Sequence, residues 1–223
     1  MKKLFVAAMM LFGVAGVAQA KDKAVAPVPT PVSSIPAPEP ENILVLELST
    51  GGEVRIQMRP DKAPTHVERV KQLARAGFYD GVLFHRVIEG FMAQTGDTKG
   101  DGSGGSPLPD LKAEFNDLPH LRGAVSMARA DAQDSANSQF FIVFTPVLRL
   151  DGKYTVFGRV MSGMQYVDAI ERGEPPLNPS KVVHAWIGAD GPNAARVPLP
   201  AVAPAPVPAP TVATPEPAPT PQK

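Results

Sequence analysis

The sequence predicts a mainly β domain, with short antiparallel strands closed on themselves and two helices over the ends. Short runs rich in β-branched and aromatic residues recur between turn signals, and only two segments have helical periodicity. Strands and helices do not alternate and no internal repeat is present, which argues against a parallel α/β fold. The predicted strands cover residues 43–48, 54–58, 82–88, 91–95, 124–128, 139–144, 155–160 and 182–187.

Local signals justify these elements in chain order. Gly51-Gly52 separates the first two runs and predicts a hairpin turn. A helix follows, since Pro64 fixes the entry, Thr65 with Glu68 matches a capping box, and Gly77 marks the end. Its apolar stripe contains Val67, Val70, Leu73 and Ala74. A second, shorter helix is predicted over residues 164–171.

The first twenty residues have the composition of a cleaved secretory signal peptide. Lys2 and Lys3 precede an apolar run over residues 4–17, and Ala18-Gln19-Ala20 is a small-x-small cleavage site. The run is shorter than the roughly 20 residues of a membrane-spanning helix, so no membrane insertion is expected. We therefore expect an exported protein, in the periplasm as first choice and secreted as second choice.

Proline divides the rest of the chain. Six of its 26 prolines lie within residues 26–40 and eleven within residues 191–223. Proline lacks an N–H and fixes φ, so such segments form neither helix nor sheet. We predict a Pro-rich linker over 21–40, one domain over 41–190, and a disordered Pro/Ala-rich tail over 191–223. These flanks are spacers or, alternatively, docking segments for an envelope partner.

Composition excludes several classes of function. The absence of cysteine rules out disulfides, thiolate catalysis and cysteine-ligated zinc. Formal net charge is zero, so nucleic acid is not an expected partner. The histidines lack metal-ligand spacing. Residues 100–105 formally match G-x-G-x-x-G, but Ser106-Pro107 follows instead of a helix, which predicts a flexible surface loop. No cofactor and no metal are expected.

Residues 84–97 and 126–144 bring unusual side chains together for a plain β domain. Alternate strand residues share a face, so Phe84 and Arg86 are expected to point the same way. Phe140 and Phe141 then lie on opposite faces, and at least one belongs to the core. The pattern alone leaves open whether Arg86 and Gln94 form a site or are ordinary surface residues.

Five groups of residues resemble cyclophilin motifs in order and approximate spacing, over about residues 42–187. They are Phe84-His85-Arg86, Gly90-Phe91-Met92-Ala93-Gln94 with Gly96-Asp97, Ser126-Met127-Ala128, Ser138-Gln139-Phe140-Phe141-Ile142, and Leu150-Asp151-Gly152-Lys153 with Val156-Phe157-Gly158. The resemblance implies a closed eight-stranded antiparallel barrel capped by two helices, with substrate lying across its outside. It also implies peptidyl-prolyl cis-trans isomerase activity on proline-containing polypeptides during folding of exported proteins.

The resemblance further implies the roles of individual residues. Arg86 would be catalytic, Gln94 would bind the substrate backbone, and His85 and Gln139 would support the floor. The proline pocket would be lined by Phe91, Met92, Phe141 and Leu150, with Ala128 and the backbone of Arg129 as its rim and Tyr154 in one wall. Arg149 stands where many relatives carry tryptophan, and the only tryptophan, Trp186, is expected in the core, so weak cyclosporin binding is expected.

The chemistry needs neither a nucleophile nor a metal. Rotation about the amide C–N bond is opposed by about 18–20 kcal/mol because nitrogen shares its lone pair with the carbonyl. A guanidinium, which stays charged at any working pH, can favour the twisted state in which that lone pair is localised. A non-catalytic module that binds proline-containing segments, as a chaperone or scaffold, is the alternative. A monomer is expected.

Overall fold

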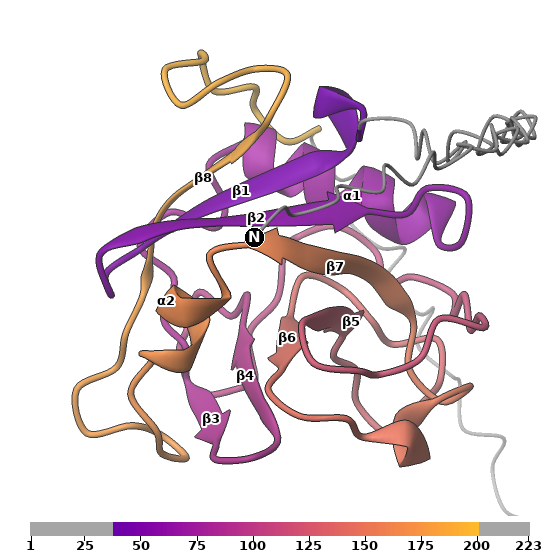
Figure 1. Cartoon of the computed structure of the whole chain (residues 1–223). Helices are drawn as coiled ribbons and strands as arrows, with labels where there is room; N and C mark the ends of the chain where they lie inside the picture. The colour runs from indigo at the N-terminus through magenta and orange to yellow at the C-terminus, as the bar shows by residue number, and fades with distance from the viewer. Residues whose placement is uncertain (1–37, 201–223) are drawn as a thin grey trace, which may run out of the picture. The chain divides into compact units, whose positions relative to one another are not determined.

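The computed structural model describes residues 38–200, which form one curled antiparallel sheet with two α-helices (Figure 1). All eight predicted strands are present, in the sheet order β3-β4-β6-β5-β7-β2-β1-β8. The strands are β1 (Ile43–Leu48), β2 (Gly52–Met58), β3 (Arg86–Ile88), β4 (Met92–Thr95), β5 (Ala124–Met127), β6 (Phe140–Val143), β7 (Val156–Ser162) and β8 (Val182–Ile187). The helices are α1 (Pro64–Arg75) and α2 (Met164–Asp168), and the 3-10 turns are η1 (Pro40–Asn42) and η2 (Leu148–Leu150).

The predicted closure of the barrel is not confirmed. The two edge strands, β3 and β8, form no ladder with each other in residues 38–200. Residues before β3 approach β8 instead: the Phe84 N–H donates to the Ser180 carbonyl and the Val182 N–H to the Val82 carbonyl, both at 2.9 Å. The strand predicted over residues 82–88 is interrupted at 84 and 85, so the sheet is an open half-barrel.

Two apolar clusters lie on opposite faces of the sheet. The main core takes side chains from all eight strands and both helices, including Phe140, which is fully buried. A smaller cluster on the other face contains Met92, Phe141 and Val143 from β4 and β6. The two neighbouring phenylalanines thus lie on opposite faces, as predicted, and the smaller cluster forms the base of a surface site.

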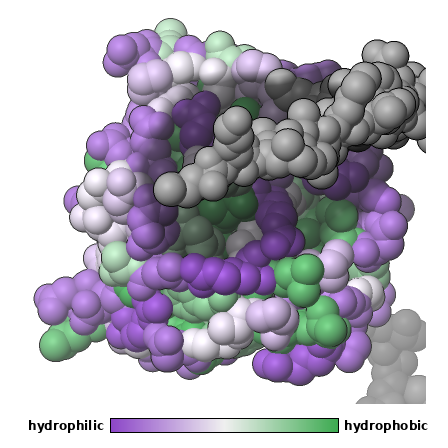
Figure 2. All heavy atoms as spheres, in the orientation of Figure 1, coloured by the Kyte–Doolittle hydropathy of each residue, from purple (hydrophilic) through white to green (hydrophobic). Residues whose placement is uncertain are grey.

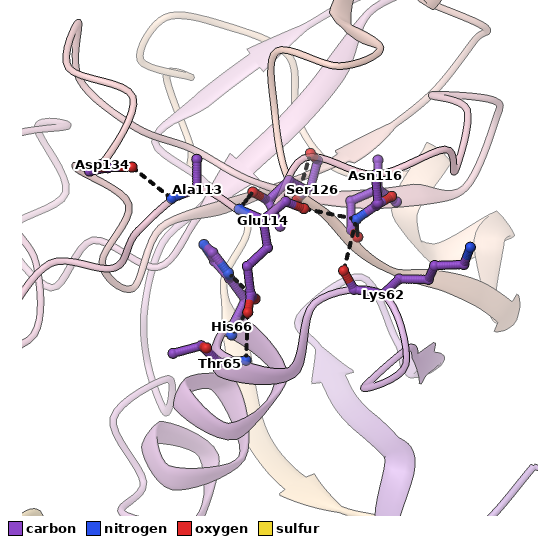
Figure 3. Close-up of polar contacts among 10 residues, drawn as sticks. Lys62, Thr65, His66, Ala113, Glu114, Asn116, Ser126 and Asp134 are labelled. Carbon is purple, nitrogen blue, oxygen red and sulfur yellow. Dashed lines mark hydrogen bonds and ion pairs between the residues drawn. The ribbon is translucent and has the colours of Figure 1, made fainter.

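The beginning of α1 differs from the prediction. Pro64 is its first residue, but Thr65 does not cap it, so the predicted capping box of Thr65 and Glu68 is wrong. Because the helix begins one residue before Thr65, this side chain lies inside the first turn. A carboxylate 48 positions away caps the helix instead: Glu114 accepts hydrogen bonds from the backbone N–H groups of Thr65 and His66, at 3.1 and 3.2 Å (Figure 3).

Hydrogen bonds with the domain continue past residue 190, its predicted end. Residues 191–200, expected to be disordered, include Arg196, whose Nη1 donates to the carbonyls of Ala74 and Ala185 at 3.0 and 3.1 Å. The Val197 N–H also donates to the Arg75 carbonyl at 3.0 Å. The predicted signal peptide over 1–20, most of the linker over 21–40, and the tail from residue 201 onward lie outside the described residues.

The surface of this domain is largely polar in the view of Figure 2, with small separate apolar areas. The most exposed large apolar residues are scattered along the chain: Leu148, Met161, Leu177, Val183 and Val197. None of the helices within residues 38–200 has the length and apolar character required to cross a bilayer.

Candidate active site

The sheet register brings the two unusual sequence segments together. Arg86 of β3 pairs with Gln94 of β4, Gln94 pairs with Phe141 of β6, and Phe141 pairs with Ser126 of β5. Directly paired residues on neighbouring strands share a face, so these side chains form one row across four strands. The row crosses the face opposite the main core.

A cavity of about 590 Å³ opens over this row. It is lined by His85, Arg86, Phe91, Met92, Gln94, Gly100, Asp101, Gly102, Ala128, Arg129, Phe141, Leu150, Tyr154, Glu174 and Pro175. Of the predicted site residues, all but Gln139 are in this lining. The structure therefore brings together residues from β3, β4, β6 and the six segments that precede or connect strands around them, in a hollow of the size of a small-ligand site.

The apolar wall of the cavity is closely packed. Met92 and Phe141 are almost fully buried, and the ring of Tyr154 meets that of Phe141 edge to face, with centroids 5.8 Å apart. The guanidinium of Arg149 lies 5.2 Å from the centroid of Phe91. Trp186 is buried in a separate cluster with Ile43 and Val45 and does not line the cavity, as expected.

The two predicted glutamines form a chain of hydrogen bonds at one side of the cavity. The Gln94 amide Nε2 donates to Gln139 Oε1 at 2.9 Å. Gln139 Nε2 in turn donates to the carbonyls of Gly102 and Gly104, at 2.9 and 2.7 Å. Gln139 therefore supports Gln94 and the neighbouring loop, and it lines an adjacent groove rather than the main cavity.

The glycine-rich loop is part of the cavity wall, which the sequence did not reveal. Asp97 organises it by accepting hydrogen bonds from the N–H groups of Lys99, Asp101 and Gly102, at 2.8, 3.1 and 2.6 Å. Burial opposes ionisation of Asp97, but the backbone donors of Lys99 and Gly102 contribute to lowering its pKa below the ordinary value. A side chain at Gly104 would collide with the Asp97 carboxylate, which explains the glycine there.

His85 lies at the edge of the cavity and is 6% exposed. Neither ring nitrogen has a hydrogen-bond partner among the described residues, and burial lowers the pKa of the imidazole. Phe84 belongs to the main core, whereas Arg86 lines the cavity, so the expectation that both share a face is wrong. The irregular backbone at residues 84 and 85 breaks the alternation.

Arg86 is half-exposed at the mouth of the cavity, and its Nε donates to Glu174 Oε2 at 2.8 Å. Glu174 and Pro175 were missed at the level of sequence because they lie 88 and 89 positions from Arg86, in the loop between α2 and β8. No periodicity predicts where such a loop meets the sheet. Within residues 38–200, no group of three or more His, Asp or Glu side chains is arranged to hold a metal ion.

The sequence is similar to those of known proteins. Residues 44–186 match the model of the family described as cyclophilin type peptidyl-prolyl cis-trans isomerase/CLD. A probable peptidyl-prolyl cis-trans isomerase of Brucella suis is 49% identical over 175 residues, which cover 71% of this chain and 89% of the relative. Peptidyl-prolyl cis-trans isomerase B of Bacillus subtilis is 43% identical over 129 residues, covering 57% of this chain and 89% of that protein.

Solved structures agree. The cyclophilin AquaCyp293 from Hirschia baltica superposes with a TM-score of 0.63 at 29% identity, covering 68% of this chain and 76% of that one. A Cryptosporidium parvum protein of the same type, crystallised in the presence of the dipeptide Ala-Pro, shares the fold with a TM-score of 0.61 at 24% identity, covering 65% and 98% of the two chains. The chain therefore belongs to the cyclophilin family of peptidyl-prolyl cis-trans isomerases.

Proposed function

We propose that this chain, a cyclophilin-type peptidyl-prolyl cis-trans isomerase, works on X-Pro bonds of polypeptides laid across its outer face, with Arg86 as the catalytic group. The observation that carries this proposal is the position of the Arg86 guanidinium beside the cavity lined by Met92 and Phe141. A cation and an apolar slot, side by side and open to solvent, match a reaction in which a proline ring is held while its amide twists.

The physical basis is differential stabilisation of the twisted amide. In the planar ground state the nitrogen lone pair is shared with the carbonyl, and it becomes localised only as the bond rotates. A preorganised guanidinium aimed at that nitrogen interacts more strongly with the twisted state and so lowers the barrier. Lysine lacks the planar fork of donors and is expected to replace Arg86 poorly.

The apolar and polar residues of the cavity bind different parts of the substrate. Phe91, Met92, Phe141 and Leu150 hold the proline ring, and the Gln94 amide, oriented by its bond to Gln139, binds the substrate backbone. Ala128 and the backbone of Arg129 form the rim, His85 supports the floor, and Tyr154 completes one wall. Proline-containing polypeptides are thus the partners, and a monomer presents the whole cavity.

A protease-coupled isomerase assay on the purified protein tests the proposal. Arg86→Ala is expected to lower kcat/KM by about a hundredfold, on the scale of losing one electrostatic donor to a transition state. Arg122→Ala is the matched control, because Arg122 is also half-exposed and paired with a carboxylate, Asp168, outside the cavity. If wild type and Arg86→Ala accelerate the proline-limited step equally little, a non-catalytic module that binds proline-containing segments is favoured instead.

Export belongs to the same proposal: residues 1–20 are removed on secretion, and the mature protein assists folding in the periplasm, or outside the cell as second choice. Support comes from the basic start, the apolar run and the Ala18-Gln19-Ala20 site. Mass spectrometry of the protein from cell fractions is expected to find an N-terminus at Lys21 in the periplasmic fraction. A cytoplasmic protein that retains Met1 would overturn this part.

A further inference from the structure

The loop between α2 and β8 brings a carboxylate to Arg86. Glu174 Oε2 accepts a hydrogen bond from Arg86 Nε at 2.8 Å, and the two side chains are 49% and 42% exposed. Glu174 also lines the cavity itself. The reaction described above assigns no task to this residue.

The main chain, and not only the ion pair, places Glu174 beside Arg86. Gly173 and Val87 exchange two backbone hydrogen bonds, each of 2.8 Å, at the free edge of β3. Gly173 has φ +147, and a Cβ there would lie 2.5 Å from the Pro176 Cα. A larger residue at this position would therefore displace the loop. The backbone pairing of Gly173 with Val87 places the next residue, Glu174, opposite Arg86.

The guanidinium atom that Glu174 contacts determines which donors of Arg86 remain available to substrate. A guanidinium is planar and has five N–H donors, one at Nε and four at the two Nη nitrogens. Glu174 engages Nε, and neither Nη of Arg86 donates to another side chain or carbonyl within residues 38–200. Fixing the Nε edge leaves the Nη edge available and limits rotation of the group about its long, flexible stem.

We propose that Glu174 is a positioning residue that holds the Arg86 guanidinium with its Nη donors toward the substrate amide. The inference rests on the catalytic role proposed for Arg86. Orientation acts mainly on the transition state, since a misplaced catalytic group loses rate even where the substrate still binds. If Glu174 instead withheld Arg86 from substrate, its removal would raise the activity.

Kinetics of Glu174→Ala and Glu174→Gln separate these cases. Glu174→Ala is expected to lower kcat by about threefold to tenfold with little change in KM, because the ion pair is half-exposed and modest in strength. Glu174→Gln keeps an acceptor oxygen and should restore most of the activity. Glu89→Ala is the matched control. Glu89 accepts a hydrogen bond of 2.6 Å from Nε of Arg172, which lies in the same loop as Glu174. Removing the Glu89 carboxylate changes the net charge equally but leaves the contacts of Arg86 intact.

Kinetics in the Arg86→Lys variant and an NMR measurement on Arg86 complete the test. In Arg86→Lys, whose ammonium cannot form the Nε contact, Glu174→Ala should cost little further activity, since residues acting through one another are non-additive. The Arg86 Nε–H signal in a nitrogen–proton NMR spectrum should shift in Glu174→Ala and stay in place in Glu89→Ala. Wild-type or higher activity of Glu174→Ala, with Arg86→Ala inactive, overturns this inference alone. Full activity of Arg86→Ala overturns the catalytic role of Arg86 first.

Discussion

His120 and Asp151 are hydrogen-bonded directly behind the apolar wall of the cavity. Asp151 Oδ1 accepts from the backbone N–H of His120 at 2.8 Å and lies 2.7 Å from its Nδ1. The fully buried imidazole stacks on Phe141, with centroids 6.2 Å apart, and its Nε2 lies 3.1 Å from Ser126 Oγ. Asp151 follows Leu150 in sequence, so this pair ties two parts of the wall together.

We expect Asp151→Ala to lower the free energy of unfolding by about 2 kcal/mol, because two donors of buried His120 lose their acceptor. Phe141 and Leu150 should loosen together, which raises KM more than it lowers kcat. Urea unfolding and steady-state kinetics measure the two effects. Asp151→Asn keeps one acceptor oxygen and should lie nearer wild type; an equal loss in both variants would contradict this account.

Glu114 gives a second prediction, since it caps α1 from a distant loop (Figure 3). Glu114→Ala is expected to cost about 1–2 kcal/mol of stability, the range for loss of a helix cap. Glu68→Ala is the control, because Glu68 would be the capping residue if the sequence motif were right. If Glu68→Ala lost more stability than Glu114→Ala, Glu68 and not Glu114 would be the residue that caps the helix.

The contribution of Glu114 should also depend on pH. Burial disfavours its ionised form, but the donors of His66 and Thr65 outweigh burial and lower the pKa of the carboxyl. Its stabilisation is therefore fully present above the ordinary value of 4.5 and is lost as pH falls through the lowered folded value. The difference in unfolding free energy between wild type and Glu114→Ala should accordingly shrink below about pH 4.

These contacts mark what the sequence could and could not predict. Local patterns found β1, β2 and α1, and the family motifs placed Arg86, Gln94 and Phe141 together. The cap by Glu114 and the contact of Glu174 with Arg86 join residues 48 and 88 positions apart. Such contacts depend on the paths of loops, which hydrophobic periodicity does not determine. Barrel closure failed for a related reason, because two irregular residues ended the strand that should have closed it.

His85 leads to a prediction on acid stability. Burial lowers its pKa, so the folded state holds the neutral ring while the unfolded state takes up a proton below the ordinary value of 6.5. The contribution of neutral His85 to the free energy of unfolding is therefore present above about pH 6.5 and is lost as pH falls below that value. His85→Gln, which does not titrate, should flatten the pH dependence of unfolding between pH 7 and 5 by at most about 1.4 kcal/mol per pH unit.

Unfolding in urea at several pH values measures this slope. His66 is also buried and has a lowered pKa, caused mainly by burial, so some dependence should remain in His85→Gln. His184, which is partly exposed, provides the control substitution His184→Gln. Parallel pH profiles of wild type and His85→Gln would show that His85 does not contribute.

Arg149 should limit the binding of cyclosporin. Its guanidinium lies over Phe91 in the cavity wall, at the position where the resemblance to the family implies tryptophan, and Trp186 is buried elsewhere. Arg149→Trp is expected to strengthen inhibition by about tenfold, the effect of one added aromatic anchor. Arg149→Ala is the control, because it removes the charge without adding an aromatic ring. Inhibition that is equally weak in wild type and Arg149→Trp would refute this explanation.

Arg196 tests whether residues 191–200 belong to the folded domain. Its guanidinium joins α1, β8 and the Asp80 carboxylate through hydrogen bonds to two backbone carbonyls and one ion pair. Arg196→Ala leaves the Ala74 and Ala185 carbonyls without this donor, so we expect a loss of about 1–3 kcal/mol in unfolding free energy. Arg55→Ala is the control, because Arg55 makes only an exposed contact of 3.5 Å with Glu53. If the two variants unfold at the same urea concentration, Arg196 does not hold this segment, and the domain ends near residue 190 as its composition suggested.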